Sequence, residues 1–284
     1  IEFDGKLISM DVVEQGPVRA VLRIRRSISK SIISQDIIVT AGSARIDFET
    51  MVEWGDERDV LLKTAFPVRI HSERARYEVP FGSIERPTHW NMPYDLSRFE
   101  VSAHKWADLS EGNYGVALLN DCKYGYDIRG QVMRLTLLRA TRNPGKNADI
   151  NKKHYFTYAL WPHKGDFTSG LVQEGYHLNS PLRAGFVDNP AGHLPASHSQ
   201  LSISGQNVVI DTVKKAEDDG ALIVRLYEAH GWHSRHTVVP SLPVLKVIET
   251  DLMENEEAAI SFNDGAVMLE FTPYQIRTLK FILM

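Results

Sequence analysis

The chain has 284 residues, of which 43% are hydrophobic and 24% are charged, and these proportions are typical of a globular protein with one or two sizeable cores. Lys and Arg number 32 against 36 Asp and Glu, giving a formal net charge of −4. A chain with this charge has no field that would gather nucleic acid or an anionic membrane. We therefore expect neither as a partner.

Cys122 is the single cysteine, so an internal disulfide is excluded. We expect a small buried thiol there, which is the commoner environment of a free cysteine. Apolar stretches such as residues 221–226 are far shorter than the roughly 20 residues of a membrane-spanning helix. The chain begins at Ile1 rather than Met and lacks a signal-peptide pattern, which is typical of a cut or processed end.

Alternating hydrophobic residues predict β-strands along most of the chain. The cleanest pattern lies at residues 45–54, and in residues 18–27 the alternation places Val18, Ala20, Leu22 and Ile24 on the buried face. Further strands are predicted at residues 60–70, 114–119, 132–138, 154–161, 208–213, 221–229, 244–252, 267–271 and 276–283.

Helical periodicity favours one short helix at residues 169–179, with Asp166 and Thr168 as caps. Turn clusters at 143–145 and 218–220 separate closely spaced strands. Such spacing favours antiparallel sandwiches over parallel α/β units, so the predicted class is all-β.

Two irregular stretches bear on organisation. Residues 181–204 are rich in Pro, Gly, Ser, Ala and His, and we predict a boundary near Ala196 that divides the chain into domains 1–195 and 196–284. Residues 82–99 mix aromatic and polar side chains and predict a long loop, which is more often functional than idle.

Several long blocks resemble the cytosolic and bacterial branch of the glycoside hydrolase family 38 α-mannosidases, in that family's order. They are GPVRAVLRI from Gly16, DVLLKTAFPV from Asp59, YEVPFGSIERPTHWN from Tyr77, RFEVSAHKWADLSEGNYGVALLNDCKYGYDIRG from Arg98, FTYALWPHKGDF from Phe156, LIVRLYEAHG from Leu222, ETDLMEN from Glu249 and TPYQIRTLKF from Thr272. The resemblance implies a galactose-mutarotase-like supersandwich at 1–195, whose N-terminal edge we expect to be truncated, and a small C-terminal β-sandwich at 196–284.

The resemblance also implies a role, which is to support the catalytic domain of an α-mannosidase and to line the groove that binds the mannoside. Family 38 enzymes are retaining and use a zinc ion, but the motifs for the nucleophile and the zinc ligands belong to earlier domains and are not in this sequence. We therefore assign no catalytic residue, metal ligand or cofactor here and expect zinc in the parent enzyme. Expected partners are an α-mannoside oligosaccharide, the upstream catalytic domain and, through exposed apolar surface, a second copy of the chain. The expected location is cytoplasmic, and the chain alone is expected to be inactive.

Sugars are held by aromatic faces and by planar polar side chains that bond hydroxyl groups. One segment with this composition follows the apolar strand at 115–119, and its candidate substrate-binding residues are Asp121, Lys123, Tyr124, Tyr126 and Asp127. Gly125 and Gly130 are expected to allow sharp turns there. The alternative is a hairpin rim whose polar groups are satisfied internally.

The second candidate combines residues 85–91 with residues 104–106, and its candidate substrate-binding residues are Arg86, His89, Trp90 and Trp106. The alternative is a loop pinned by buried aromatic side chains, because Trp is usually mostly buried. If the two segments lie close together in the fold, the hypothesis that they line a substrate groove is strengthened.

Three other signals favour structural explanations. His230, His233 and His236 have a spacing that could hold a metal, but a hairpin turn is favoured. A nucleophilic role for Cys122 and a calcium loop at residues 218–220 are disfavoured for want of partner groups. Two other functions stay open, namely a stand-alone carbohydrate-binding module and a sugar epimerase, which would need a positioned His and carboxylate.

Overall fold

The computed structural model describes residues 5–143, 151–188 and 191–284. Within them the chain divides into two compact units, one with the residues up to Val79 together with Ile84–Leu182, the other with Pro80–Ser83 and Arg183–Met284. The predicted boundary at Ala196 lies in an exposed, irregular stretch and stays a prediction. The predicted turn at 143–145 falls mostly outside the described residues.

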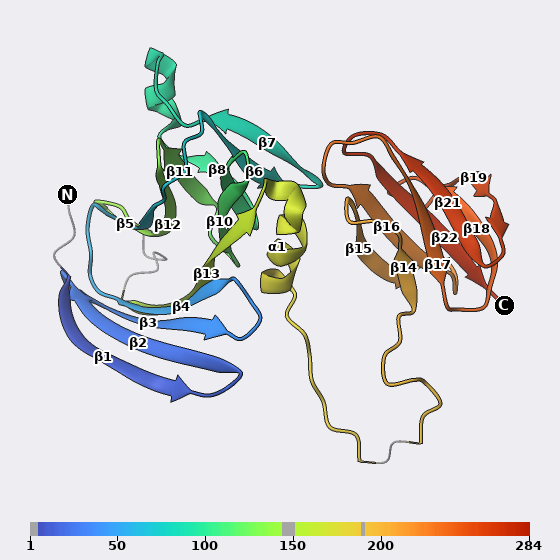
Figure 1. Ribbon diagram of the computed structural model, residues 1–284, viewed down its shortest axis with the longest axis horizontal. Helices are drawn as coiled ribbons and strands as arrows, with labels where there is room; N and C mark the ends of the chain where they lie inside the picture. Colours follow the sequence, from blue (N-terminus) through green and yellow to red (C-terminus); the bar gives the residue numbers. More distant parts are fainter. Residues whose placement is uncertain (1–4, 144–150, 189–190) are drawn as a thin grey trace. The chain divides into compact units, whose positions relative to one another are not determined.

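The first unit is a sandwich of a nine-stranded and a four-stranded antiparallel sheet (Figure 1). In pairing order, the larger sheet contains β1 (Lys6–Gln15), β2 (Arg19–Ile28), β3 (Ser31–Thr40), β4 (Ile46–Trp54), β13 (Lys152–Lys164), β10 (Tyr114–Asn120), β9 (Trp106–Glu111), β6 (Arg74–Val79) and β7 (Gly82–Pro87). The smaller sheet contains β5 (Val60–Pro67), β12 (Val132–Ala140), β11 (Gly125–Arg129) and β8 (Val101–Ser102). The all-β class is confirmed.

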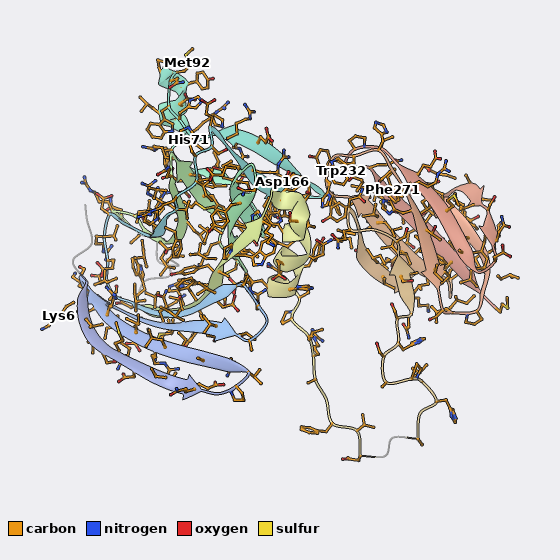
Figure 2. The ribbon with its side chains drawn as sticks, viewed as in Figure 1. Lys6, His71, Met92, Asp166, Trp232 and Phe271 are labelled. Atoms are coloured by element: carbon orange, nitrogen blue, oxygen red, sulfur yellow. The ribbon has the colours of Figure 1, made fainter. Side chains whose placement is uncertain are left out.

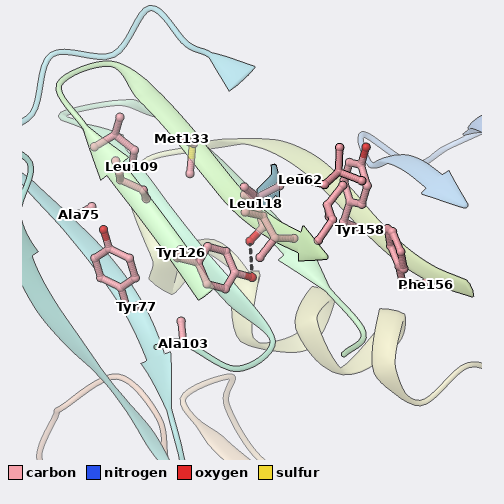
Figure 3. Packing of buried hydrophobic residues seen from close by; sticks show 14 of the residues in the cluster. Leu62, Ala75, Tyr77, Ala103, Leu109, Leu118, Tyr126, Met133, Phe156 and Tyr158 are labelled. Atoms are coloured by element: carbon pink, nitrogen blue, oxygen red, sulfur yellow. Dashed lines mark hydrogen bonds between the residues drawn. The ribbon is translucent and has the colours of Figure 1, made fainter. Parts of the chain in front are cut away.

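The main core lies between these sheets, where Leu118 and Tyr158 of the larger sheet belong to one cluster with Tyr126 and Met133 of the smaller (Figure 3). Each fully buried large side chain of this kind contributes roughly 1.5–3 kcal/mol. The central strands β9 and β10 are buried on both faces, because helix α1 (Leu171–Asn179) packs against the side facing away from the smaller sheet.

The predicted helix is confirmed, beginning at Leu171 rather than at residue 169. A 3-10 turn, η2 (Phe167–Ser169), precedes it, and Asp166 caps that turn by accepting the N–H of Thr168 at 2.9 Å. Gly170, with φ of 107°, lies between the two elements. Among the residues that the structure describes, no helix is long and apolar enough to cross a membrane.

The second unit is a smaller sandwich with its own core, which includes Leu226, Val247, Phe271 and Phe281. One sheet contains, in pairing order, β14 (Leu201–Ile203), β17 (Ser234–Pro240), β21 (Ala266–Phe271) and β20 (Phe262–Asn263). The other contains β15 (Val208–Lys215), β16 (Leu222–Glu228), β22 (Ile276–Leu283), β18 (Val244–Thr250) and β19 (Glu256–Ile260).

The prediction of one long loop at residues 82–99 is wrong in part. Its first third is strand β7, and its end is a 3-10 helix, η1 (Pro93–Arg98). The buried carboxylate of Asp95 fixes this helix, because it accepts the N–H groups of Asn91 and Met92 at 3.0 Å each. The helix projects from the unit with apolar side chains exposed, among them Met92 (Figure 2).

The predicted inward face of residues 18–27 is wrong at Val18, whereas Ala20, Leu22 and Ile24 are half-buried and alternate with exposed residues such as Arg23. Val18 is 67% exposed, whereas Val21 is the buried residue of β2. The larger sheet has more than twice as many strands as the smaller, and its edge strand β1 keeps most side chains exposed, while those of β2 are mostly exposed or half-buried. Leu7, Ile8 and Val12 of β1 consequently leave apolar surface uncovered.

The loop after β16 is organised by the fully buried carboxylate of Glu228. It accepts the N–H groups of His230, Gly231 and Trp232 at 2.7–3.0 Å and that of Tyr274 at 3.1 Å. Burial acts to raise the pKa of Glu228, but these hydrogen bonds and one from the Asn207 amide outweigh it and hold the pKa below its ordinary value. Ionised Glu228 therefore stabilises the second unit.

We predict that Glu228→Gln lowers the free energy of unfolding of the second unit by about 2 kcal/mol at pH 7, because an amide cannot accept all of these bonds. A carboxyl with a lowered folded-state pKa stabilises above its unfolded pKa of about 4.3 and loses that effect as the pH falls through the folded value. The difference between the two proteins should therefore shrink below pH 4 in urea unfolding followed by hydrogen exchange. Glu270→Gln, at an exposed ion pair with Arg235, is the control and should change little.

Candidate functional site at the paired turns

Two tight turns lie side by side in the first unit, residues 103–105 between β8 and β9 and residues 121–124 between β10 and β11, and we call them the paired turns. The N–H of Ala103 donates to the carbonyl of Tyr124 at 3.1 Å. The rings of His104 and Tyr124 are 5.4 Å apart. The two turns therefore present one continuous surface.

Asn120 holds both turns from beneath. It is the last residue of β10 and is fully buried. Its amide nitrogen donates to the carbonyl of His104 at 2.7 Å and to the hydroxyl of Tyr126, while its amide oxygen accepts the N–H of Lys123. One side chain thus fixes the backbone of each turn and the start of β11.

Glu78 holds the first turn from the other side. Its carboxylate, 5% exposed, accepts the backbone N–H and the ammonium of Lys105, both at 2.6 Å. Its carbonyl accepts the N–H of His104 at 3.1 Å. The Lys105 ammonium lies 4.6 Å from the centre of the Tyr176 ring of α1, so the helix also supports the turn.

The predicted residues of the first segment occupy different environments. Tyr124 is 54% exposed on the paired turns. Lys123 lies 4.5 Å from the centre of the Phe156 ring, and Asp121 accepts the N–H of Thr157 at 2.9 Å. Lys123 and Asp121 are both half-buried.

Tyr126 cannot present its phenol to a ligand in this fold. The side chain is fully buried, and its hydroxyl donates to the carbonyl of Leu118 at 3.2 Å (Figure 3). Burial also raises its pKa. We therefore no longer expect Tyr126 to contact a sugar.

Asp127 lies on the outer face of the smaller sheet within a group of cations. It is 3.3 Å from Arg134, 3.9 Å from Lys63 and 4.0 Å from Arg129. The guanidinium of Arg129 in turn lies 3.1 Å from the centre of the Trp90 ring. These contacts link the two predicted segments through Asp127.

A cavity of about 40 Å³ lies where the segments converge, lined by Arg86, His89, Trp90 and Asp127 among others. That volume suits a water molecule or two rather than a sugar ring. Arg86 donates to the carbonyl of Ser102 at 2.9 Å, and burial lowers its pKa. His89 and Trp90 keep exposed surface.

Trp106 belongs to the packing of the first unit. It is 1% exposed, and its ring lies 6.0 Å from that of Phe167. A Cβ atom on Gly175 of α1 would approach its indole to 2.9 Å. The alternative, in which a buried aromatic side chain fixes the segment, therefore describes Trp106 better than contact with a sugar does.

Several residues of the site were not singled out from sequence. The signal for Asn120 is a polar residue that ends an otherwise apolar strand, and no comparable pattern marks Glu78. Gly130 has the expected positive φ, 55°, but Gly125 does not. Gly125 is needed for space instead, because a Cβ atom there would collide with the carboxylate of Glu100.

Among the described residues, no group of three or more His, Cys, Asp and Glu side chains could hold a metal ion. His230 and His236 are both 6% exposed, and the Nδ1 of His236 contacts the carbonyl of Ser204. Residues 217–220 form a bend whose Asp219 accepts the N–H of Ala221 at 2.8 Å, which confirms the predicted turn. The residues present here do not fit a zinc site.

Cys122 is exposed on the second of the paired turns, so the expectation of a buried thiol is wrong. Partial burial and the hydrogen bond and negative charge of Asp121 raise its pKa to about 11. The thiolate is therefore scarce at neutral pH.

An imidazole and a carboxylate meet at His163 and Asp108, with Nε2 and Oδ1 2.8 Å apart. Their side chains are 2% and 3% exposed. An acid–base pair for sugar epimerisation has to reach its substrate, and this pair is enclosed by the packing of β9 and β13.

Two family descriptions match the chain. "Glycosyl hydrolases family 38 C-terminal domain" matches residues 3–147, and "Glycosyl hydrolases family 38 C-terminal beta sandwich domain" matches residues 207–279. Alpha-mannosidase 2C1 of Homo sapiens is 45% identical over 88% of this chain and 24% of its own length. Alpha-mannosidase G of Dictyostelium discoideum is 38% identical over 95% of this chain and 26% of its own length. The chain thus spans about a quarter of the curated relatives it matches.

Among solved structures, an alpha-mannosidase from Enterococcus faecalis V583 superposes with a TM-score of 0.83 over 98% of this chain and 35% of that chain, at 17% identity. At that identity the likeness establishes the fold alone.

We predict that Asn120→Ala lowers the free energy of unfolding by about 2 kcal/mol, because the partly buried carbonyl of His104 and N–H of Lys123 each lose their hydrogen-bond partner. Amide exchange in residues 103–105 and 121–124 should accelerate in the same variant. Asn113→Ala, in the exposed turn at the opposite end of β10, is the matched control. Equal protection of the paired turns in both variants would contradict the role given to Asn120.

We predict that the alkylation rate of Cys122 by iodoacetamide rises about tenfold per pH unit and levels off near pH 11, because only the thiolate reacts. Asp121→Asn should move the midpoint to lower pH by removing a negative charge. Cys122→Ser supplies the baseline, and a wild-type midpoint near pH 8 would contradict the assigned environment.

Proposed function

Because the chain belongs to glycosyl hydrolase family 38, we propose that it is the C-terminal β portion of a retaining, zinc-dependent α-mannosidase. Its role there is to support the catalytic domain and to line the groove that binds the mannoside. The observation that carries this proposal is the rigid anchoring of the paired turns by Asn120 and Glu78, with His104 and Tyr124 exposed above them.

The paired turns suit a sugar because they combine an aromatic face with polar groups. The Tyr124 ring can stack on the C–H surface of a pyranose, while His104 and Lys123 can bond its hydroxyl groups. The anchoring by buried side chains means that these groups need little further ordering when ligand binds, which favours affinity. His89 and Trp90 are secondary candidates, because the cavity beside them is small.

Retaining hydrolysis needs two carboxyl groups about 5 Å apart, one as nucleophile and one as acid and base. We assign both, and the zinc ion, to the part of the polypeptide outside this chain, because the described residues do not fit a metal site. The present residues orient substrate and exclude water, and they perform no bond-breaking step.

The proposed partners are an α-mannoside oligosaccharide and the catalytic domain of the same polypeptide. Exposed apolar residues on β1 and η1 could also support pairing with a second copy. With a net charge of −4, nucleic acid and membranes are not proposed as partners. We place the parent enzyme in the cytoplasm.

We predict that this chain alone does not hydrolyse an aryl α-mannoside, whereas a polypeptide that joins it to its upstream sequence does. In the longer polypeptide, Tyr124→Ala should lower kcat/KM about tenfold through lost stacking. Tyr155→Ala, which removes a ring of 69% exposure on β13, is the control. Activity of the isolated chain would refute the proposal.

Saturable mannoside binding by the isolated chain, without activity in the longer polypeptide, would favour a carbohydrate-binding module instead.

A further inference from the structure

A groove of about 760 Å³ opens beside the paired turns; Tyr124 belongs to both, and Gly125, the first residue of β11, also lines the groove. Its other lining residues include Phe99, Glu100, Thr136 and Arg139. The volume falls within the range of roughly 300–1,000 Å³ found for sites that enclose drug-sized ligands. It is too large for one sugar ring alone.

The groove exists because strand β12 is longer than its neighbour. β12 pairs with β5 from Val132 to Ala140, but with β11 only as far as Leu135. Beyond that residue, and within the part of the chain that the structure describes, this edge of β12 has no strand partner. The second of the paired turns and the residues around Phe99 stand along the open edge.

The floor of the groove carries a fixed carboxylate. Glu100 accepts the hydroxyl of Thr136 at 2.6 Å and lies 3.1 Å from the ammonium of Lys63. The missing Cβ of Gly125 makes room for it. Its side chain is 23% exposed, so the held carboxylate can still accept a hydroxyl hydrogen bond from a ligand.

The walls offer two exposed aromatic rings, Phe99 at 59% and Tyr124 at 54% exposure. Arg139 is an exposed cation along the same groove. Aromatic faces beside planar polar side chains suit the alternating C–H and hydroxyl surfaces of an oligosaccharide.

We propose that this groove binds the inner sugar residues of an α-mannoside oligosaccharide whose terminal mannose lies at the paired turns. The inference rests on the proposed function and adds a second binding site to it. It makes the enzyme selective for oligosaccharides over short mannosides, because a short mannoside leaves the groove empty.

The test compares kcat/KM on a linear mannopentaose and on an aryl mannoside, using the polypeptide that joins this chain to its upstream sequence. We express selectivity as kcat/KM on the mannopentaose divided by kcat/KM on the aryl mannoside. Phe99→Ala and Arg139→Ala should each lower this ratio about fivefold, the size expected for one lost aromatic or polar contact. Phe186→Ala, a fully exposed ring outside the groove, is the matched control and should leave the ratio unchanged. Thermal melting checks that each variant is folded.

An unchanged ratio in both groove variants would overturn the inference. An equal loss of kcat/KM on both substrates would overturn it too. So would a lower melting temperature of the joined polypeptide, because the groove would then be a surface that packs against the upstream part. Failure of the proposed function gives a different result, because Tyr124→Ala would then leave kcat/KM unchanged on both substrates.

Discussion

The buried amide of Asn120 is the interaction on which the geometry of the first unit's candidate site depends. It ends a strand that is covered on both sides, so its polar atoms have to find protein partners. It finds them in two turns and in the phenol of Tyr126. The positions of His104 and Tyr124 at the surface follow from a hydrogen-bond requirement in the interior.

The sandwich architecture supports the binding role proposed for the first unit, although the described residues include no group that could hold a metal ion. Its sheets bury a broad core, and the loops at their ends are positioned by that rigid base. Strand β12 extends beyond its neighbour β11, and the backbone edge that is left without a partner forms one side of the groove. The surfaces that we propose for recognition in this unit lie at irregularities of the sheets.

Strands with one covered face could be predicted from sequence, because burial imposes alternation on them. The bounds of β22 agree with the predicted 276–283, and β4 begins one residue after the predicted start. β1 and β3 were missed, since β1 is exposed on both faces and β3 is half-buried along most of its length, so neither alternates clearly. β9 was missed for the opposite reason, as both of its faces are buried.

The candidate site was predictable in location but not in composition. Residues 120–127 have a composition that marks a polar turn, but nothing in the sequence distinguishes the exposed ring of Tyr124 from the buried ring of Tyr126. That difference depends on strand phase, which is set by the register of β11 with β12. Glu78 was missed because it meets the first turn only through a long-range contact. Glu100 was missed because its partners Thr136 and Lys63 are distant in the sequence.

The exposed thiol of Cys122 has a practical consequence. Because it is the single cysteine of the chain, a fluorescent or spin label attached there would occupy one known position. The neighbouring Tyr124 ring and the groove beyond it would then lie within the label's surroundings. In this chain Cys122 is thus an attachment point for a reporter of the proposed ligand, and labelling is fastest at raised pH, where more of the thiol is ionised.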